Sequence, residues 1–487
     1  MASVRGLAGS LCLLLLACAP GRQVNGLAPH EDQWLELSSP HFTVATDLGE
    51  AEAREQVARL ERALLALTNA PLPISPVPAI RMRVALMTGL EEFQRLTGRR
   101  AAGIATVASA GEPLFIATVG DMQAQELIIN HELEHLLQAL VVPRAPRWLK
   151  EGLADYAATF VFEDGARGPV VAFGAPSPWR AFSWRDGLDL APYLSDDWSA
   201  VDEEEARRAY AVGWLTVDYL LEKRGQEFFA WMHQLGPVGG RVPPLLEAFP
   251  GLTLESLREA LEQHLRQPNY KKLLFASPPW TGAVSLRRLA PAEALAMLSE
   301  LVRPGPLQTP AQAEQLAQAL ALQAVGLDPR EPAAMLVAEP YQPRSGRAER
   351  AKACAAAHPA DWRCPALAAM AKEASSADKL KSWERAARLG PEVPAALANL
   401  ARYLTEARQY DRAASVALLA LRGAPANPAF LEVLASARAG QGRCEEAREL
   451  AARAAAIASL HRRGGPAGQG RGLFEKCTPA TPPTTPP

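Results

Sequence analysis

The first part of the chain alternates apolar and polar residues in the manner of β-strands. Four short segments show this pattern, at 41–46, 80–87, 104–107 and 114–118. Between the first two, apolar residues recur with helical spacing over 50–68, which predicts a long amphipathic helix. The pattern therefore predicts a small mixed sheet with a helix packed on it.

A more uniformly apolar stretch, 127–141, predicts a second helix that is largely buried. Pro143 and Pro146 end this helix and turn the chain, because proline breaks a helix and restricts the residue before it. Apolar residues then recur with helical spacing over 148–160. We expect two neighbouring antiparallel helices.

The buried helix carries two histidines, His131 and His135, separated by four positions. This spacing places both imidazoles on one helix face, one turn apart, where they can bind the same zinc ion. Glu132 lies between them and can act as a general base toward a water molecule. The alternative is an ordinary amphipathic helix with exposed histidines, but the apolar flanks argue against it, since burying these groups without a metal would be costly. Glu134 is expected to be solvated or to lie behind the ligands.

The second helix offers a third ligand. Glu151 follows His135 after fifteen intervening residues, and a catalytic zinc site uses three protein ligands. Asp155 lies one turn after Glu151 on the same face, where it can accept a hydrogen bond from a ligand histidine and orient its ring. A local cap or salt bridge is the alternative role for Asp155.

At these motifs the sequence resembles the gluzincin metallopeptidases, in particular peptidase MA-like and aminopeptidase N-like catalytic domains. The resemblance rests on HELEH at 131–135 and WLKEGLA at 148–154, and it extends over about 34–235. The glutamate–aspartate pair also resembles that of thermolysin. The resemblance implies one Zn²⁺ per chain. It implies His131, His135 and Glu151 as the zinc ligands and Glu132 as the catalytic base.

A further motif, YAVG at 210–213, resembles the Tyr-x-x-Gly helix start of the aminopeptidase family. The resemblance implies that the Tyr210 hydroxyl donates to the oxyanion of the tetrahedral intermediate. The alternative is that Tyr210 is one more core aromatic at the front of an apolar helix.

The sequence also departs from the aminopeptidases. Residues 108–117 stand where those enzymes carry a Gly-x-Met-Glu-Asn element that holds the free amine of the substrate. An endopeptidase is therefore favoured over an aminopeptidase. In the gluzincin plan an edge strand beside the zinc pairs with extended peptide, and we expect 114–118 to be that strand.

The N-terminus has the form of a secretory signal. Arg5 precedes a leucine-rich stretch, 7–17, that is too short to span a bilayer stably. The stretch ends in Leu-Leu-Ala before Cys18, which resembles a bacterial lipobox with Cys18 as the lipidated residue. Plain cleavage near this point is the alternative. We expect an exported protein of the cell envelope or periplasm, attached to the membrane only through a lipid anchor.

The remaining cysteines agree with export, since an even number in an oxidising compartment allows disulfides. Three connectivities are open to Cys354, Cys364, Cys444 and Cys477. Pairing Cys354 with Cys364 and Cys444 with Cys477 closes the shortest loops, and we expect this pairing.

The 487 residues are enough for two or three domains. The net charge is −2 and charges of both signs are interspersed, so the sequence lacks the basic footprint of a nucleic-acid-binding protein. It also lacks a glycine-rich phosphate loop.

The C-terminal part repeats itself. Proline and small residues recur thirty-four positions apart, for example at Pro394 and Pro428. The same offset relates the segment Tyr410-Asp411-Arg412-Ala413 to the segment Cys444-Glu445-Glu446-Ala447. This period matches tetratricopeptide helix pairs, whose concave face can hold a protein or peptide partner. The alternative is an alanine-rich helical bundle without regular repeats.

These patterns predict an α+β protein, with a small mixed sheet and a helical lobe of gluzincin type, followed by an all-α tetratricopeptide-like domain. The expected boundaries are a signal peptide at 1–18, the metallopeptidase domain at 30–268, a linker or helical connection at 269–305, the repeat domain at 306–463 and a disordered tail at 464–487.

The expected function is zinc-dependent hydrolysis of peptide bonds in a peptide or protein substrate. The competing hypothesis is a catalytically silent metallopeptidase fold that serves as a binding scaffold through its repeats. A non-peptidase hydrolase with the same zinc site is a third hypothesis.

Overall fold

The computed structural model of the chain describes residues 34–70, 81–107, 113–119, 122–165, 168–173, 190–195, 203–236, 242–266, 273–276, 280–371, 374–425 and 427–461. The predicted signal peptide with Cys18, the tail at 464–487 and Cys477 lie outside the described residues.

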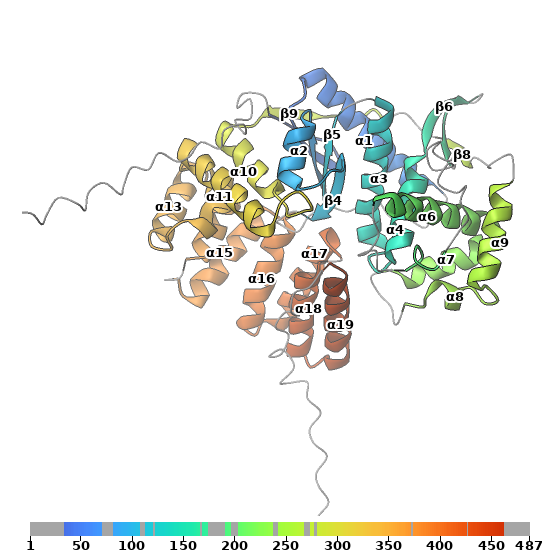
Figure 1. The fold of residues 1–487 in the computed structure, drawn as a ribbon. Coiled ribbons are helices and arrows are strands. Elements are labelled where there is room, and N and C mark those ends of the chain that lie inside the picture. Colours follow the sequence, from blue (N-terminus) through green and yellow to red (C-terminus); the bar gives the residue numbers. More distant parts are fainter. Residues whose placement is uncertain are drawn as a thin grey trace, which may run out of the picture.

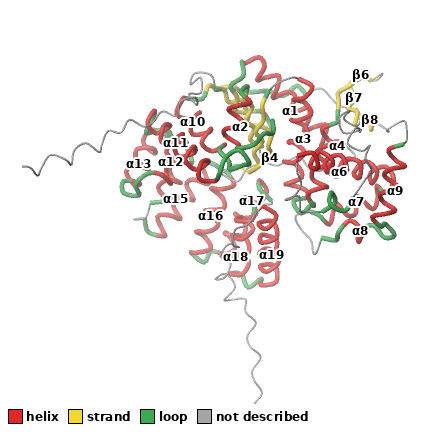
Figure 2. Tube along the Cα trace, in the orientation of Figure 1, coloured by secondary structure: helices red, strands yellow, loops and turns green. Residues whose placement is uncertain are grey.

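A six-stranded mixed sheet forms the centre of the N-terminal part (Figures 1 and 2). Its order is β4-β5-β3-β2-β1-β9, with bounds β1 Leu35–Ser38, β2 Phe42–Thr46, β3 Met82–Met87, β4 Gly103–Val107, β5 Pro113–Thr118 and β9 Ser285–Arg288. The three central strands β2, β3 and β5 run parallel, whereas β1, β4 and β9 pair antiparallel with their neighbours. The predicted strands all form.

The strand predicted to lie at the edge beside the metal does not lie there. Residues 114–118 belong to β5, which pairs with β3 on one side and with β4 on the other. All six residues of β5 are buried, as expected for an internal strand. The sheet edge at this end is β4.

Helices cover both faces of the sheet. On one face lie α1 (Glu50–Asn69) and α3 (Met122–Val141), whose apolar side chains share a core with the inward residues of β1 to β3. On the other face lie α2 (Leu90–Thr97) and α10 (Pro291–Leu301) with α11 (Pro310–Leu327) and α12 (Pro332–Ala338). The strand residues alternate between these two cores, because successive side chains of a strand point to opposite faces.

The segment predicted as a linker or helical connection, 269–305, contributes to both sheets. It contains β9, which extends the six-stranded sheet at β1, and β8 (Leu273–Ala276), which joins a three-stranded sheet with β6 (Val161–Gly165) and β7 (Gly168–Phe173). It also contains α10, on the second face of the large sheet. The six-stranded sheet and the first helices of the predicted repeat domain thus share a core.

A helical lobe stands on the α3 side of the sheet. It is built from α4 (Arg147–Ala158), α6 (Glu203–Lys223), α7 (Gly225–Gln234), α8 (Leu245–Ala248) and α9 (Leu254–Leu265). Tryptophans hold it together, and Trp148 of α4 stacks on Trp231 of α7 with ring centroids 6.0 Å apart.

Helices continue to the C-terminal end of the described chain, with a short 3₁₀ turn, η1 (Glu339–Tyr341), after α12. These are α13 (Arg347–Ala357), α14 (Arg363–Ala369), α15 (Ser376–Leu389), α16 (Pro394–Glu406), α17 (Tyr410–Gly423), α18 (Pro428–Gly440) and α19 (Cys444–His461). Helices α16 and α18 both begin at a proline, thirty-four residues apart, and α17 and α19 begin at the same spacing. The sequence period therefore coincides with a helix-pair period.

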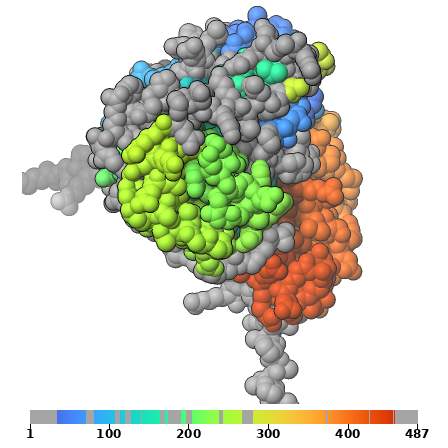
Figure 3. Space-filling view, turned by 90° about the vertical axis from the view of Figure 1, so that its right-hand side faces the viewer, coloured from blue at the N-terminus to red at the C-terminus, as the bar shows by residue number. Residues whose placement is uncertain are grey.

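The helices form an arc that curves back toward the N-terminal part (Figure 1). In the space-filling view, the C-terminal helices (orange and red) lie to the lower right of the helical lobe (green and yellow) (Figure 3). Glu449 of α19 interacts electrostatically with Arg144, which lies in the turn between α3 and α4. The end of the arc thus approaches the helices that carry the histidines and Glu151.

A disulfide joins Cys354 of α13 to Cys364 of α14, as predicted, with their Cα atoms 5.3 Å apart. Cys444 at the start of α19 is also disulfide-bonded. Its predicted partner, Cys477, lies outside the described residues.

The architecture confirms the predicted α+β class, with a small mixed sheet followed by many helices. Within the described ranges, no helix combines the length and the apolar character needed to cross a membrane.

Candidate metal centre

Helix α3 presents two histidines at one point. Its apolar residues, among them Leu133, Leu136 and Leu137, are buried against the sheet and the helical lobe, which fixes the rotation of the helix. His131 and His135 lie on the remaining face, and their Nε2 atoms are 3.1 Å apart. The i, i+4 spacing therefore brings the two nitrogens together as predicted.

Helix α4 brings Glu151 to the same point. Its Oε2 atom lies 3.5 Å from His131 Nε2 and 3.3 Å from His135 Nε2. The turn through Pro143 and Pro146 allows this approach. The Gln138 side chain fixes it, because its Nε2 donates to the backbone carbonyl of Lys150 at 2.9 Å.

The three atoms fit a zinc ion. Two ligands about 2.0–2.1 Å from tetrahedral zinc are about 3.3 Å from each other. The distances among His131 Nε2, His135 Nε2 and Glu151 Oε2 are 3.1, 3.3 and 3.5 Å, close to the edges of such a tetrahedron. Glu151 Oε2 is buried, and no hydrogen bond of good geometry reaches it within the described part of the chain. These three residues also form the one group of possible metal ligands found among the described residues.

The charge of Glu151 is stabilised by its neighbours. Burial alone would raise the pKa of the Glu151 carboxyl, but the imidazoles of His135 and His131 outweigh burial and hold this pKa well below its ordinary value. Glu151 is therefore an anion, the form that binds a metal.

Asp155 lies behind His131. Its Oδ1 is 3.0 Å from Nδ1 of His131, on the opposite side of the ring from the Nε2 that faces Glu151. Asp155 is buried, so it offers its carboxylate to the ring rather than to water. This geometry is that of a carboxylate that fixes the orientation of a ligand histidine.

Glu132 lies beside the sheet edge. A Cβ atom built on Gly103, the first residue of β4, would lie 2.9 Å from Glu132 Cγ and 3.2 Å from its Oε1. The side chain of Glu132 therefore rests against the start of the edge strand. Only glycine leaves room for it there.

Tyr210 comes to the site from α6. The centroid of its ring lies 6.1 Å from that of His131. Burial raises the pKa of the Tyr210 phenol above its ordinary value, and the nearby Glu151 carboxylate raises it further. The hydroxyl therefore keeps its proton at neutral pH and can donate it in a hydrogen bond.

Glu134 is not solvated. Its side chain is fully buried, and Gln138 Nε2 donates to its Oε1 at 3.3 Å. Burial raises the pKa of Glu134 well above its ordinary value. The apolar surroundings of α3 extend around this position, so Glu134 belongs to the interior behind the two histidines.

The structure thus brings together the six residues that the sequence singled out: His131, Glu132, His135, Glu151, Asp155 and Tyr210. Sequence reasoning missed Gln138 and Gly103. Gln138 lies one turn beyond His135 on the same helix, and this spacing was the available signal. No sequence signal identified Gly103, because its role depends on which strand forms the sheet edge.

No protein-family model matches the chain, and a search of curated proteins gave no significant match.

Proposed function

We propose that the protein is a zinc-dependent metallopeptidase of gluzincin type. The observation that carries this proposal is the triangle of two imidazole nitrogens and one carboxylate oxygen, with edges of 3.1, 3.3 and 3.5 Å. His131, His135 and Glu151 would hold the ion, with one coordination position left open.

A zinc ion bound there would supply a Lewis acid that polarises the scissile carbonyl and makes water more acidic. Glu132 takes the proton from the attacking water and delivers it to the leaving amine. Asp155 holds His131 in one tautomer and one orientation.

Tyr210 would stabilise the transition state. Its neutral hydroxyl donates a hydrogen bond toward the oxygen on which negative charge develops. Its position beside His131, rather than deep in the core, favours this role over a purely structural one.

The sheet edge suggests how an extended substrate is held. The outer side of β4 has no neighbouring strand among the described residues, and its first residue contacts Glu132. A peptide added to β4 as a further strand would run past the base. Such a peptide needs no free N-terminus, which favours endopeptidase action.

The cellular location and the repeats complete the proposal. The N-terminal signal pattern and the disulfide of Cys354 and Cys364 favour export to an oxidising cell envelope, with a lipid anchor at Cys18. The thirty-four-residue helix pairs favour a tetratricopeptide-like arc that recruits a protein partner.

The test uses the full-length protein, metal analysis and a proteome-derived peptide library incubated with and without 1,10-phenanthroline. We expect one zinc per chain and cleavage that is lost with the chelator and restored by zinc. Glu132→Gln is the matched control: it should keep its zinc and lose at least about 100-fold in cleavage rate.

Two results would contradict the proposal. Full turnover by Glu132→Gln would remove Glu132 from the mechanism. Stoichiometric zinc without any chelator-sensitive cleavage would favour the catalytically silent scaffold instead.

A further inference from the structure

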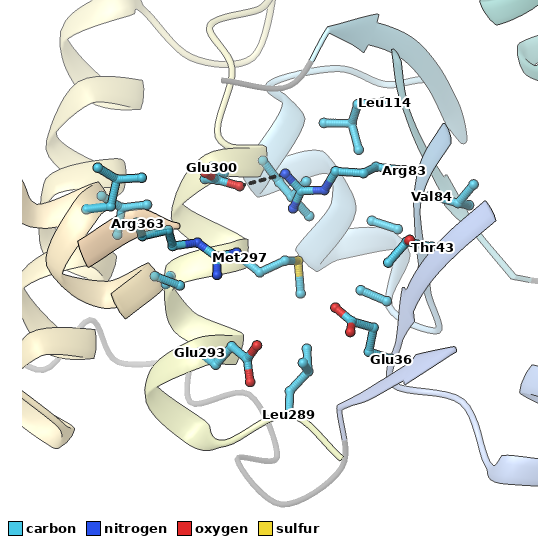
Figure 4. A pocket seen from close by; sticks show the side chains of 17 residues that line it. Glu36, Thr43, Arg83, Val84, Leu114, Leu289, Glu293, Met297, Glu300 and Arg363 are labelled. Atoms are coloured by element: carbon cyan, nitrogen blue, oxygen red, sulfur yellow. Dashed lines mark hydrogen bonds and ion pairs between the residues drawn. The ribbon is translucent and has the colours of Figure 1, made fainter. Parts of the chain in front are cut away.

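A pocket of about 630 Å³ lies on the other side of the sheet from α3, between the sheet and the helical arc. Its walls come from β1 to β3, from α10 and α12, and from α14 to α16. An inner cavity of about 60 Å³ continues it, since the two share Arg83, Glu300 and Arg363 (Figure 4). Pockets of this size between structural units are typical of ligand sites.

Charged groups enter this pocket from opposite walls. Arg83 reaches in from β3 and pairs with Glu300 of α10 at 2.9 Å, while Arg363 reaches in from α14 (Figure 4). Arg363 is held by Asp361 at 3.0 Å and lies over the Trp362 ring, 5.5 Å from its centroid. These guanidinium groups are therefore preorganised.

Two further arginines line the outer pocket. Arg81 is exposed beside β3, and Arg303 is held by the backbone carbonyls of Val302, at 2.8 Å, and Glu300. Burial lowers the pKa of Arg303. A carboxylate placed in the pocket could accept charge-assisted hydrogen bonds from these guanidinium groups.

The helical wall supplies aromatic surface. Trp362 and Trp383 of α15 both line the pocket. A ligand that brings an apolar group can pack against this surface.

Carboxylates that line the same pocket indicate which chemical class of ligand it can bind. Glu36 of β1 and Glu392 before α16 line the pocket together with Glu300. A polyphosphate would be repelled by three carboxylates, whereas a ligand with both carboxylate and amide or amine groups matches the mixed lining.

We propose that this pocket binds a short peptide with at least one carboxylate and one apolar side chain, clamped between the sheet and the helical arc. This site is separate from the metal centre, and its occupancy does not require hydrolysis there.

The test is isothermal titration of zinc-loaded, full-length Glu132→Gln protein with the tetrapeptide Gly-Asp-Leu-Phe. The Glu132→Gln substitution keeps the tetrapeptide from being hydrolysed during the titration. Peptide binding is therefore measured independently of catalysis. We expect saturable binding at one site. Arg81→Glu and Arg363→Gln should each raise Kd at least about tenfold.

Arg100→Glu is the matched control, because Arg100 is exposed and does not line the pocket, and it should leave Kd unchanged. Arg81 is itself exposed, so its substitution leaves the fold intact. Titration with inorganic pyrophosphate should show no binding. The proposal is overturned by absence of saturable peptide binding, by binding insensitive to both arginine substitutions, or by binding of pyrophosphate in place of the peptide.

Discussion

Gly152 of α4 and Gly213 of α6 meet backbone to backbone. A Cβ atom on Gly152 would lie 2.5 Å from the carbonyl carbon and oxygen of Gly213, and one on Gly213 would lie 2.8 Å from the carbonyl oxygen of Trp148. This contact lets the two helices approach closely. It thereby sets Tyr210, one turn before Gly213, beside Glu151, which immediately precedes Gly152.

Replacing Gly213 by alanine should push the two helices apart. We expect a loss of about 1–3 kcal/mol in the free energy of unfolding, because the new methyl group meets backbone that cannot move aside. Peptide hydrolysis should fall as well, since Tyr210 moves with α6. Urea unfolding and kinetics measure both effects.

Gly326→Ala is the control for this helix contact. Gly326 lies in α11 with nothing within 4 Å of the added methyl group. Alanine there should be neutral or stabilise the protein by up to about 1 kcal/mol. Equal stability of the Gly213 variant and the wild-type protein would contradict the close helix contact.

Replacing Gly103 by alanine tests the contact between β4 and Glu132. The added methyl group would meet Ile128 at 2.6 Å and Glu132 Cγ at 2.9 Å, and must displace the Glu132 side chain. We expect a lower kcat/KM with unchanged zinc content. Loss of zinc along with activity would instead indicate that α3 itself had moved.

A zinc ion held by His131, His135 and Glu151 would stabilise the folded protein. A ligand that binds only the folded state contributes about 2.7 kcal/mol when its free concentration is 100 times Kd. Dialysis against a chelator should therefore lower Tm, and zinc should restore it. Glu151→Gln should show no such response, while Tyr210→Phe should respond like the wild-type protein, because it keeps all three ligands.

His264 of α9 and Asp218 of α6 form a buried pair, with Nε2 and Oδ2 2.7 Å apart. Burial raises the pKa of Asp218, although the hydrogen bond with His264 opposes this. His264→Leu should cost about 3–5 kcal/mol in the free energy of unfolding, because it leaves a buried carboxylate without its partner. The double variant His264→Leu, Asp218→Leu should recover part of that loss. Asp218→Leu alone completes the cycle, and single-variant losses that simply add up to the loss in the double variant would show that the pair is not coupled.

The disulfide between α13 and α14 should contribute measurably to stability. Cys354 and Cys364 are ten positions apart in the sequence, and closing a loop of this length is worth about 2–3 kcal/mol. We expect the Cys354→Ala, Cys364→Ala variant to unfold at lower urea concentration than the wild-type protein. Cys444→Ala removes only the other disulfide, so its effect on stability measures the contribution of that disulfide separately. Free thiols at both positions in the purified native protein would contradict the pairing.

The sequence by itself determined the local elements and most of the candidate site. Helical spacing placed His131 and His135 on one face, and proline placement turned the chain back to deliver Glu151, because both effects act within a few residues. The helix-pair period was equally visible, since it depends on local spacing alone.

Only the tertiary structure decided which strand forms the sheet edge. Residues 114–118 and 103–107 both look like strands, and strand order depends on pairings between distant segments that local patterns do not encode. For the same reason, the sequence patterns did not predict strand β9 in the segment that resembled a linker. They also did not predict the burial of Glu134 or the contact of Gly103 with Glu132. Some of these features arise where segments that lie far apart along the chain pack together. The burial of Glu134 arises where other segments pack against both faces of one helix.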